Sequence, residues 1–279
     1  MGKFDQVLLI SDYDDTLVYT RDSFENGAPL SEMPEYNRKR ICDFMEQGGT
    51  FALVTGRSWP LIRSFFSRIP TNAPCGIDNG AAIIDPAAGG YLYQRPLPDG
   101  VLDHLREIHA AFPAVCCELF RADHGCDAFQ PSAYTYRHAK NCRYTFRTID
   151  DFSQTRPPLL KVLFEGDAAG LDAIRRWAAD RPWAADYELV FSGSSLLEMV
   201  ATGANKGVLS LEMARLCGKS PDHLYCVGDQ QNDIPMLKAA RQGFCPSNAV
   251  PAVQAVAQAV GHCRDGAVGQ VIDILDALY

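Results

Sequence analysis

The segment LLISDYDDTLV, residues 8–18, joins an apolar run typical of a buried β-strand to a group of aspartates, Asp12, Asp14 and Asp15. Side chains alternate faces along a strand, so Asp12 and Asp14 project the same way from its carboxyl end. Carboxylates so close repel each other, and one keeps a proton unless a cation lies between them. A solvated loop is the alternative, because Asp also caps the helix that often follows a strand. The segment alone leaves both interpretations open.

The composition describes a chain that can bury a substantial core. Its 279 residues, 47% of them hydrophobic, suffice for one large domain or two modest ones. The net charge of −8 argues against binding nucleic acid or an anionic membrane over a broad surface. No apolar run approaches the roughly 20 residues that span a bilayer. The segment MGKFDQVLLISDYDD ends its apolar run at acids, as a first strand does and a signal peptide does not. We therefore expect a cytoplasmic protein with no membrane or nucleic-acid partner.

The 10 cysteines do not have the pattern of a disulfide framework. They are scattered along the chain without a CxxC pair, and free cysteine often serves as a small buried hydrophobic residue. A mid-chain group could hold a metal or form a cross-link, but it lacks the regular spacing of zinc sites. This group consists of Cys116, Cys117, Cys126 and Cys142.

Strand and helix signals alternate in the first and last parts of the chain. The first part reads VLLIS (strand), PEYNRKRICDFMEQGG (helix), TFALVTG (strand), SWPLIRSFFSRI (helix) and APCGI (strand). The last part reads NKGVLSLEMARLCG (helix), HLYCVGD (strand), DIPMLKAA (helix), QGFCP (strand), VPAVQAVAQAV (helix) and AVGQVIDILDAL (helix). This alternation predicts an α/β domain, formed by residues 1–85 and 187–279, with helices on both faces of a parallel sheet.

The middle of the chain, residues 86–186, has a different character. YLYQRPL, AVCCELFR, AYTYRH, CRYTFRTI and PLLKVLFEGD have the composition of strands. PDGVLDHLREIHAAF and AAGLDAIRRWAA have the periodicity of helices. We therefore expect an inserted α+β domain, joined to the first domain near residues 85 and 187.

Polar residues gather where the predicted parallel strands end. Ligands bind beyond the carboxyl ends of the strands in such a sheet, so separate segments can build one site there. The chain supplies carboxylates, a hydroxyl group and a cation to this edge. These residues are Asp12 and Asp14, then Thr55, Gly56 and Arg57, then Lys206 at a helix start, and finally GDQQND, residues 228–233.

Each residue type in this set suits phosphate chemistry. Asp229 and Asp233, four positions apart across a strand-to-helix turn, can converge on one cation, and oxygen ligands suit Mg²⁺ better than zinc or copper. The Thr55 hydroxyl, the Gly56 N–H and the Lys206 ammonium can donate to phosphate oxygens. A carboxylate can then attack phosphorus and be regenerated by water. Together these groups favour the cation-bound interpretation of the aspartates.

The motifs resemble those of the haloacid dehalogenase superfamily. DYDDT, VTGR, NKG and GDQQND stand in the order of that superfamily's motifs, which is more specific than any single motif. An insert between the second and third motifs resembles the cap of the Cof-like (IIB) branch. IDNGA, LLKVLFEGD, LEMVATGANKG and PSNAVPAV also resemble text of Cof-like phosphatases, but the similarity is weak from residue 92 to 157. The resemblance implies a HAD-like Rossmannoid three-layer core with an α+β type C2 cap.

The resemblance also implies roles in catalysis. Asp12 would be the nucleophile that forms an aspartyl-phosphate. Asp14 would protonate the leaving oxygen and later activate water as a base. Thr55 and Lys206 would hold the phosphoryl oxygens, with Lys206 also neutralising charge as the bond breaks.

The same resemblance implies a magnesium site. Mg²⁺ would be bound by Asp12, by the main-chain carbonyl of Asp14 and by Asp229. Asp233 would support this shell directly or through water. Asn232 would orient the phosphate-binding lysine or a phosphate oxygen.

Other positions near the motifs have two interpretations each. Arg57 either contacts substrate or anchors its loop, and Asn79 either lines the entrance of the site or caps a turn. Asp15 stands where the family usually has Gly; we expect a solvent-facing turn residue there and an enzyme that stays active. His124 and His138 lack metal-ligand spacing, so we expect them to be structural or surface residues.

A basic segment, YRHAKNCRYTFR, lies within the predicted cap at residues 136–147. It could face a second anionic group of the substrate. The interpretation we favour is an exposed edge strand kept soluble by charge, in which the last two cations would share a face. The cations are Arg137, Lys140, Arg143 and Arg147.

The sequence thus predicts a Mg²⁺-dependent phosphatase for a small phosphorylated metabolite, with a cap that closes over it. A sugar phosphate is expected by family analogy alone. One alternative is a phosphomutase or phosphotransferase that delivers the phosphoryl group to a sugar hydroxyl. Another is a catalytically silent phosphometabolite-binding protein. The physiological substrate and the oligomeric state do not follow from the sequence.

Overall fold

The strand that precedes the aspartates lies in the middle of a mostly parallel sheet. The computed structural model describes residues 2–28, 30–193 and 195–279. Strand order in this sheet is β14-β13-β12-β1-β2-β3-β4-β5, with antiparallel pairing only where β4 meets β3 and β5. The strands are β1 (Leu8–Ser11), β2 (Thr50–Val54), β3 (Cys75–Ile77), β4 (Ala82–Ile84), β5 (Tyr91–Gln94), β12 (Leu224–Val227), β13 (Gln242–Cys245) and β14 (Gln258–Ala259).

Helices cover both faces of this sheet, which explains why β1 is apolar at successive positions. Leu9 packs into a buried cluster with residues of α2, α3 and α10. Leu8 and Ile10 point to the opposite face and pack with residues of α7, α8 and α9. These helices are α2 (Glu35–Glu46), α3 (Trp59–Phe66), α7 (Lys206–Leu216), α8 (Ile234–Ala239), α9 (Pro251–Gln254) and α10 (Ala267–Leu278); the short α1 (Arg21–Asn26) follows β1.

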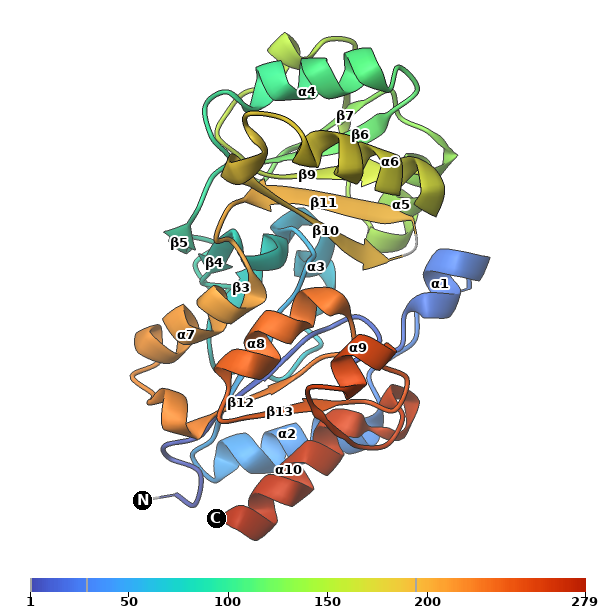
Figure 1. Ribbon diagram of the computed structural model, residues 1–279. Helices are drawn as coiled ribbons and strands as arrows, with labels where there is room; N and C mark the ends of the chain where they lie inside the picture. The colour runs from blue at the N-terminus through green and yellow to red at the C-terminus, as the bar shows by residue number, and fades with distance from the viewer. Residues whose placement is uncertain (1, 29, 194) are drawn as a thin grey trace.

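A second sheet carries the inserted part of the chain, and we call residues 97–201 the cap. Its strand order is β10-β11-β9-β6-β7-β8, with parallel pairing between β7 and β8. Helices α4 and α6 cover the outer face (Figure 1). The elements are α4 (Val101–Ala111), β6 (Cys116–Arg121), β7 (Cys126–Phe129), α5 (Ala133–Cys142), β8 (Arg147–Ile149), β9 (Leu159–Glu165), α6 (Ala168–Ala179), β10 (Tyr187–Gly193) and β11 (Leu196–Ala201).

The sheets divide the chain differently from the predicted boundaries near residues 85 and 187. Strand β5, expected in the insert, pairs with β4 in the first sheet. Strands β10 and β11, expected in the first domain, pair with each other and with β9 in the second sheet. Composition does not distinguish these strands, because sheet membership depends on pairing with distant segments.

Two predicted elements are wrong in type or length. AYTYRH, expected to be a strand, begins α5, where Ser132 caps the helix and exchanges hydrogen bonds with Thr135 in a capping box. The helix expected over VPAVQAVAQAV ends at Gln254, and Gln258–Ala259 then form β14 beside β13. Aromatic and β-branched residues favoured a strand in the first case, and the helix cap outweighs that preference.

The described residues contain no helix that is both long and apolar enough to cross a membrane. The cytoplasmic location stays a prediction.

Candidate active site

Asp12 and Lys206 meet at the carboxyl edge of the parallel sheet. Asp12 follows β1, and its backbone N–H donates to the carbonyl of Val227 at the end of β12 (2.9 Å). Lys206 is the first residue of α7, whose N-cap Asn205 accepts hydrogen bonds from backbone N–H groups of the first turn. The Lys206 Nζ donates to Asp12 Oδ1 at 2.7 Å and to Asp233 Oδ1 at 2.6 Å. All three side chains are buried, so the sheet edge holds an interior charge cluster.

This cluster contains more negative than positive charge. Burial raises the pKa of Asp12 to about 8; Lys206 opposes this rise, while Asp233 and Asp14 add to it. Burial, Asp233 and Asp12 raise the pKa of Asp229 well above its usual range. Burial and the neighbouring carboxylates thus oppose ionisation of Asp12 and Asp229, and a bound cation would favour their charged forms.

Three of these carboxylates could hold a metal ion. Asp12, Asp229 and Asp233 each offer a carboxylate oxygen, and these oxygens lie within 4.8 Å of one another. Oδ2 of Asp229 is buried and accepts no hydrogen bond from the described residues, while Oδ1 accepts from Thr16 Oγ1 at 2.8 Å. An all-oxygen set with an unpartnered buried oxygen suits a hard divalent cation.

Both carboxylate oxygens of Asp233 accept hydrogen bonds from other groups of the protein. Its Oδ1 accepts from Lys206, and its Oδ2 accepts from the backbone N–H groups of Asp229 and Gln230, both at 2.9 Å. These bonds hold the turn after β12 in place. Asp233 therefore positions Asp229 and Lys206, as well as adding negative charge.

Asp14 is clamped by Arg57 rather than by the lysine. Arg57 donates from Nε and Nη2 to the two carboxylate oxygens of Asp14, at 2.9 and 2.7 Å. Its buried guanidinium lies over the Tyr13 ring, 4.9 Å from the centroid. Burial raises the pKa of Asp14, but the charge and hydrogen bonds of Arg57 outweigh it, so the net pKa is lowered. Arg57 thus anchors Asp14 and also lines the cavity, while its contact with substrate stays a prediction.

Asp15 is not the solvent-facing turn residue that we expected. It has a positive φ of 54°, a backbone conformation that glycine adopts more readily than other residues. Its carboxylate turns inward and accepts hydrogen bonds from the backbone N–H groups of Thr20 and Arg21, at 2.8 and 3.0 Å. These two hydrogen bonds connect Asp15 to the start of α1.

Three residues that were predicted to bind substrate differ in how far they lie from the surface of the site. Thr55 is buried at the end of β2, and its Oγ1 accepts from the Arg57 N–H at 3.1 Å. Asn79 is also buried, with a positive φ of 56°. It accepts a hydrogen bond from Asn232 Nδ2 at 3.1 Å. Asn232 itself lines the pocket, so Asn79 supports the site from behind rather than lining its entrance.

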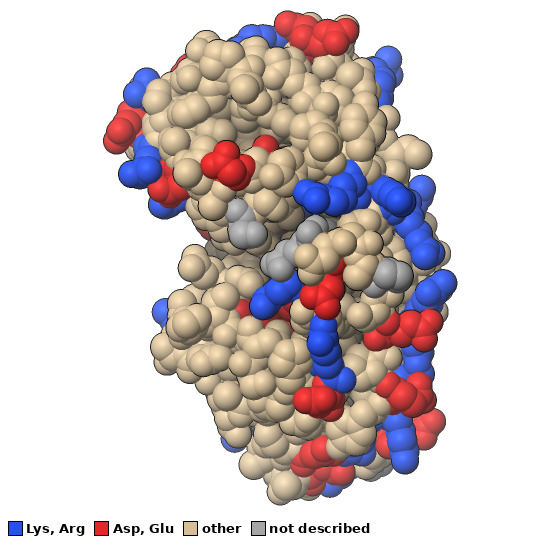
Figure 2. All heavy atoms as spheres, turned by 90° about the vertical axis from the view of Figure 1, so that its right-hand side faces the viewer, with Lys and Arg blue, Asp and Glu red and all other residues tan. Residues whose placement is uncertain are grey.

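A cavity of about 820 Å³ lies over these residues, and the molecule is hollowed between the cap and the rest of the chain (Figure 2). The predicted residues that line it are Asp12, Asp14, Gly56, Arg57, Lys206, Asp229 and Asn232. The cap residues with polar side chains that line it include Tyr134, Arg137, His138, Lys161 and Glu198.

Lys161 and Glu198 connect the cap directly to the motif after β2. The Lys161 Nζ donates to the Gly56 carbonyl at 2.6 Å and lies 3.2 Å from Glu198 Oε2. A Cβ atom at Gly56 would lie 3.1 Å from Glu198 Oε1, so glycine permits this close approach. Sequence analysis did not select this pair. The sequence does contain a signal for this pair, because each charged residue interrupts an apolar strand. The strands are LLKVLFE and LLEMVA.

His138 is a buried cap residue with acidic neighbours. Its Nδ1 lies 2.8 Å from Glu118 Oε2 and 3.5 Å from Glu165 Oε1. Burial lowers the pKa of His138, but Glu118 outweighs it and the net pKa lies well above the usual range. The three side chains could also hold a metal ion. His138 is therefore buried rather than at the surface, and it lines the cavity of about 820 Å³.

The basic segment 136–147 divides among three places instead of forming one edge strand. Arg137 lines the cavity of about 820 Å³. Lys140 and Arg143, at the end of α5, line a separate cavity. Arg147, in β8, is paired with Asp127 at 2.9 Å. The helix in place of the expected strand is the reason for this division.

Comparison with known proteins agrees with this geometry. The family model described as haloacid dehalogenase-like hydrolase matches residues 9–272. The chain belongs to the haloacid dehalogenase-like hydrolase family. The predicted family is thereby confirmed, and the predicted fold, a Rossmannoid core with a cap, is shared with solved structures of this family.

Several relatives illustrate the range of similarity. The chain is 23% identical to the 5-amino-6-(5-phospho-D-ribitylamino)uracil phosphatase YitU of Bacillus subtilis, over 90% of each chain. It is 31% identical to the chloroplastic endoribonuclease YBEY of Arabidopsis thaliana over 105 residues, but these span only 18% of that protein. A solved HAD subclass IIB sugar phosphatase superposes with a TM-score of 0.81 at 18% identity, covering 97% of this chain and 99% of the other.

Proposed function

We propose that this protein is a Mg²⁺-dependent phosphatase that hydrolyses a small phosphorylated metabolite through a phosphorylated Asp12. The observation that carries the proposal is the convergence on one sheet edge of a buried carboxylate, a lysine 2.7 Å from it, and two further aspartates. Asp14 lies two residues away at the same cavity. This set supplies a nucleophile, a cation, a metal shell and an acid.

In the first step a carboxylate oxygen of Asp12 attacks phosphorus while the bond from phosphorus to the leaving oxygen breaks. Lys206, already within hydrogen-bond distance of Asp12, balances charge on the phosphoryl oxygens. Asp12, Asp229 and the Asp14 carbonyl would hold Mg²⁺, with Asp233 in support. When bound, the ion would lower the repulsion between the nucleophile and the phosphoryl group.

Asp14 would move the protons of both steps. It gives a proton to the leaving oxygen in the first step, and takes one from the water that attacks phosphorus in the second. That second attack breaks the bond to Asp12, releases phosphate and restores both carboxyl groups. Arg57 keeps the two oxygens of Asp14 in a fixed orientation through its paired hydrogen bonds. The Thr55 hydroxyl and the Gly56 N–H would complete the binding of the phosphoryl group.

The cap would recognise the rest of the substrate. We place its limits at residues 97–201, and the cations and carboxylate that it contributes to the cavity include Arg137, Lys161 and Glu198. Groups of both charge signs suit a polyhydroxylated substrate, whose hydroxyls can donate and accept. Two names support this choice of a phosphorylated sugar or polyol: YitU is named for a phosphoribityl compound, and the structural neighbour is named a sugar phosphatase.

The test is phosphate release from a panel of phosphorylated sugars, polyols, nucleotides and flavin or pyridoxal phosphates, with Mg²⁺ and with EDTA. We expect metal-dependent release concentrated on one class, and its loss in Asp12→Asn. Release at the wild-type rate in Asp12→Asn would overturn the proposed nucleophile. Transfer of phosphate to a sugar acceptor in place of release would instead indicate a phosphomutase or phosphotransferase. Substrate binding with neither release nor transfer would indicate a silent binding protein.

A further inference from the structure

A second cavity, of about 680 Å³, lies beside the catalytic one, and none of the described residues lines both. Residues 12–14 bring the two cavities close together. Tyr13 lines the second cavity, while its neighbours Asp12 and Asp14 line the catalytic one. The volume falls within the range of about 300–1,000 Å³ that is usual for small-molecule sites.

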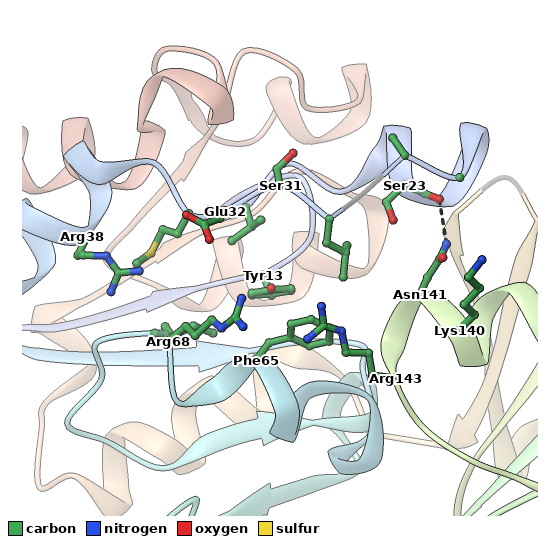
Figure 3. A pocket seen from close by; sticks show the side chains of 16 residues that line it. Tyr13, Ser23, Ser31, Glu32, Arg38, Phe65, Arg68, Lys140, Asn141 and Arg143 are labelled. Atoms are coloured by element: carbon green, nitrogen blue, oxygen red, sulfur yellow. Dashed lines mark hydrogen bonds between the residues drawn. The ribbon is translucent and has the colours of Figure 1, made fainter.

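Cationic side chains from three parts of the chain line this cavity (Figure 3). Among the described lining residues, Glu32 is the acidic one. Arg38 has an exposed partner, Glu35, at 3.6 Å. Within the described part of the chain, the other cations have no carboxylate within ion-pair distance. The four cations are Arg38 of α2, Arg68 after α3, Lys140 of α5 and Arg143 at the end of α5.

This gathering of positive charge is unusual for the molecule. The chain carries a net charge of −8, yet Lys and Arg side chains group together at the border between the cap and the rest of the chain (Figure 2). Like charges around a concavity repel one another and focus a positive potential inside it. An anion in the cavity would relieve that repulsion.

The wall of the cavity between the cations is apolar and aromatic. It includes the rings of Tyr13 and Phe65 together with Met33 and Ile69. The Arg143 guanidinium lies 5.4 Å from the centroid of the Phe65 ring. A ligand with a flat apolar body could therefore contact the rings while its anionic group meets the cations.

The cavity also joins the cap to the rest of the chain. Lys140 and Arg143 belong to the cap, whereas Arg38 and Arg68 do not. At its rim, Asn141 Nδ2 of α5 donates to the Ser23 carbonyl of α1 at 2.9 Å (Figure 3). A ligand held by cations from both sides would connect α5 to the first sheet's domain.

We propose that this second cavity binds a small organic phosphate, an anionic head on a flat apolar body, at a site separate from the catalytic pocket. The proposal rests on the charges and walls of this cavity and does not depend on the proposed phosphatase activity.

Isothermal titration calorimetry with α,β-methylene-ADP tests this proposal. The probe carries a flat base and a diphosphonate group that resists hydrolysis. Titrations are done with the full chain in EDTA. The key variant is Arg68→Glu/Arg143→Glu. Its matched control for net charge is Arg176→Glu/Arg215→Glu, at side chains that are 72% and 67% exposed. Lys206→Met removes the cation of the catalytic pocket, so weaker binding in this variant would show that the probe binds there.

We expect wild type, the matched control and Lys206→Met to bind the probe with similar affinity. Each reversed charge in Arg68→Glu/Arg143→Glu should weaken binding about tenfold. Unchanged affinity in that variant would overturn the proposal. So would loss of binding in Lys206→Met alone, or the absence of any binding to wild type. If the charge-reversed variant does not fold by circular dichroism, Arg68→Gln/Arg143→Gln takes its place with the same expected direction.

Discussion

The Nζ atom of Lys206 lies 2.7 Å from Oδ1 of Asp12, although the two residues are 194 positions apart in the chain. The parallel pairing of β1 with β12 and the cap of α7 by Asn205 bring them together. A buried ammonium at this distance is the charge that a phosphoryl group would meet on reaching Asp12. This relationship predicts that replacement of Lys206 lowers the rate of turnover strongly.

Lys206→Met should lower kcat by about 10²–10³, the range for removal of one charge-stabilising group in a transition state. Lys206→Arg keeps the charge and should retain more activity than Lys206→Met. Steady-state kinetics on the preferred substrate measure both variants, and circular dichroism confirms that they fold. A Lys206→Met enzyme with near-wild-type kcat would show that this ammonium does not act on the reacting group.

Arg57→Gln should move the alkaline limb of the kcat/KM profile to higher pH. Arg57 is the reason that the net pKa of Asp14 is lowered. Its removal raises that pKa, so a larger fraction of Asp14 is protonated at a given pH and available as the acid. Arg57→Lys keeps a positive charge and should shift the limb less. A limb that stays in place in Arg57→Gln would contradict the assignment of Asp14.

Asp78→Asn should stabilise the protein at alkaline pH. Burial raises the pKa of Asp78 from 3.8 to about 6, although Lys161 and Ser58 oppose the rise. A raised carboxyl pKa stabilises the folded state below the unfolded pKa, and this contribution is lost as pH rises through about 6. The free energy of unfolding of Asp78→Asn, relative to that of wild type, should therefore rise by about 1–2 kcal/mol between pH 5 and pH 8.

Urea unfolding at the two pH values measures this difference in the free energy of unfolding. The exposed Asp99→Asn controls for the change in net charge. If the difference in the free energy of unfolding between Asp78→Asn and wild type does not vary with pH, the pKa of Asp78 is not raised in the folded state.

Lys161 and Glu198 should be strongly coupled. Their side chains are 2% and 4% exposed, so Lys161→Met alone leaves a buried carboxylate and should cost about 3–5 kcal/mol. The double variant Lys161→Met/Glu198→Leu should be less destabilised than the sum of the single variants. Urea unfolding of wild type, Lys161→Met, Glu198→Leu and the double variant gives the double-mutant cycle. Additive effects would mean that the two charges do not stabilise each other.

The catalytic edge of the sheet could be predicted from the sequence because its signals are local. An apolar run that ends in acids marks the end of a parallel strand, and Asp12, Asp14 and Asp229 are such residues. The structure brings them to one cavity. Asp15 was harder, since its inward turn depends on a positive φ and on the backbone of Thr20 and Arg21.

The cap could be predicted much less well, because its site residues depend on contacts between distant strands. Lys161 and Glu198 lie on different strands of the second sheet and meet only through β9 and β11 pairing. Residues 136–147 were predicted to form an edge strand, and this prediction placed Arg143 and Arg147 on one face. In the structure Arg143 ends α5 in a left-handed conformation, which turns the chain before Arg147 begins β8.

The central claim is that the phosphoryl group passes through Asp12. The most direct measurement is mass spectrometry of acid-quenched Asp14→Asn after mixing with Mg²⁺ and p-nitrophenyl phosphate. The leaving group of this substrate needs no proton from residue 14, so the variant can complete the first step but lacks the base for the second. The account predicts one added phosphoryl group on the peptide that contains Asp12, and none in Asp12→Asn. A phosphoryl group on another residue, or full turnover by Asp12→Asn without any phosphorylated peptide, would contradict it.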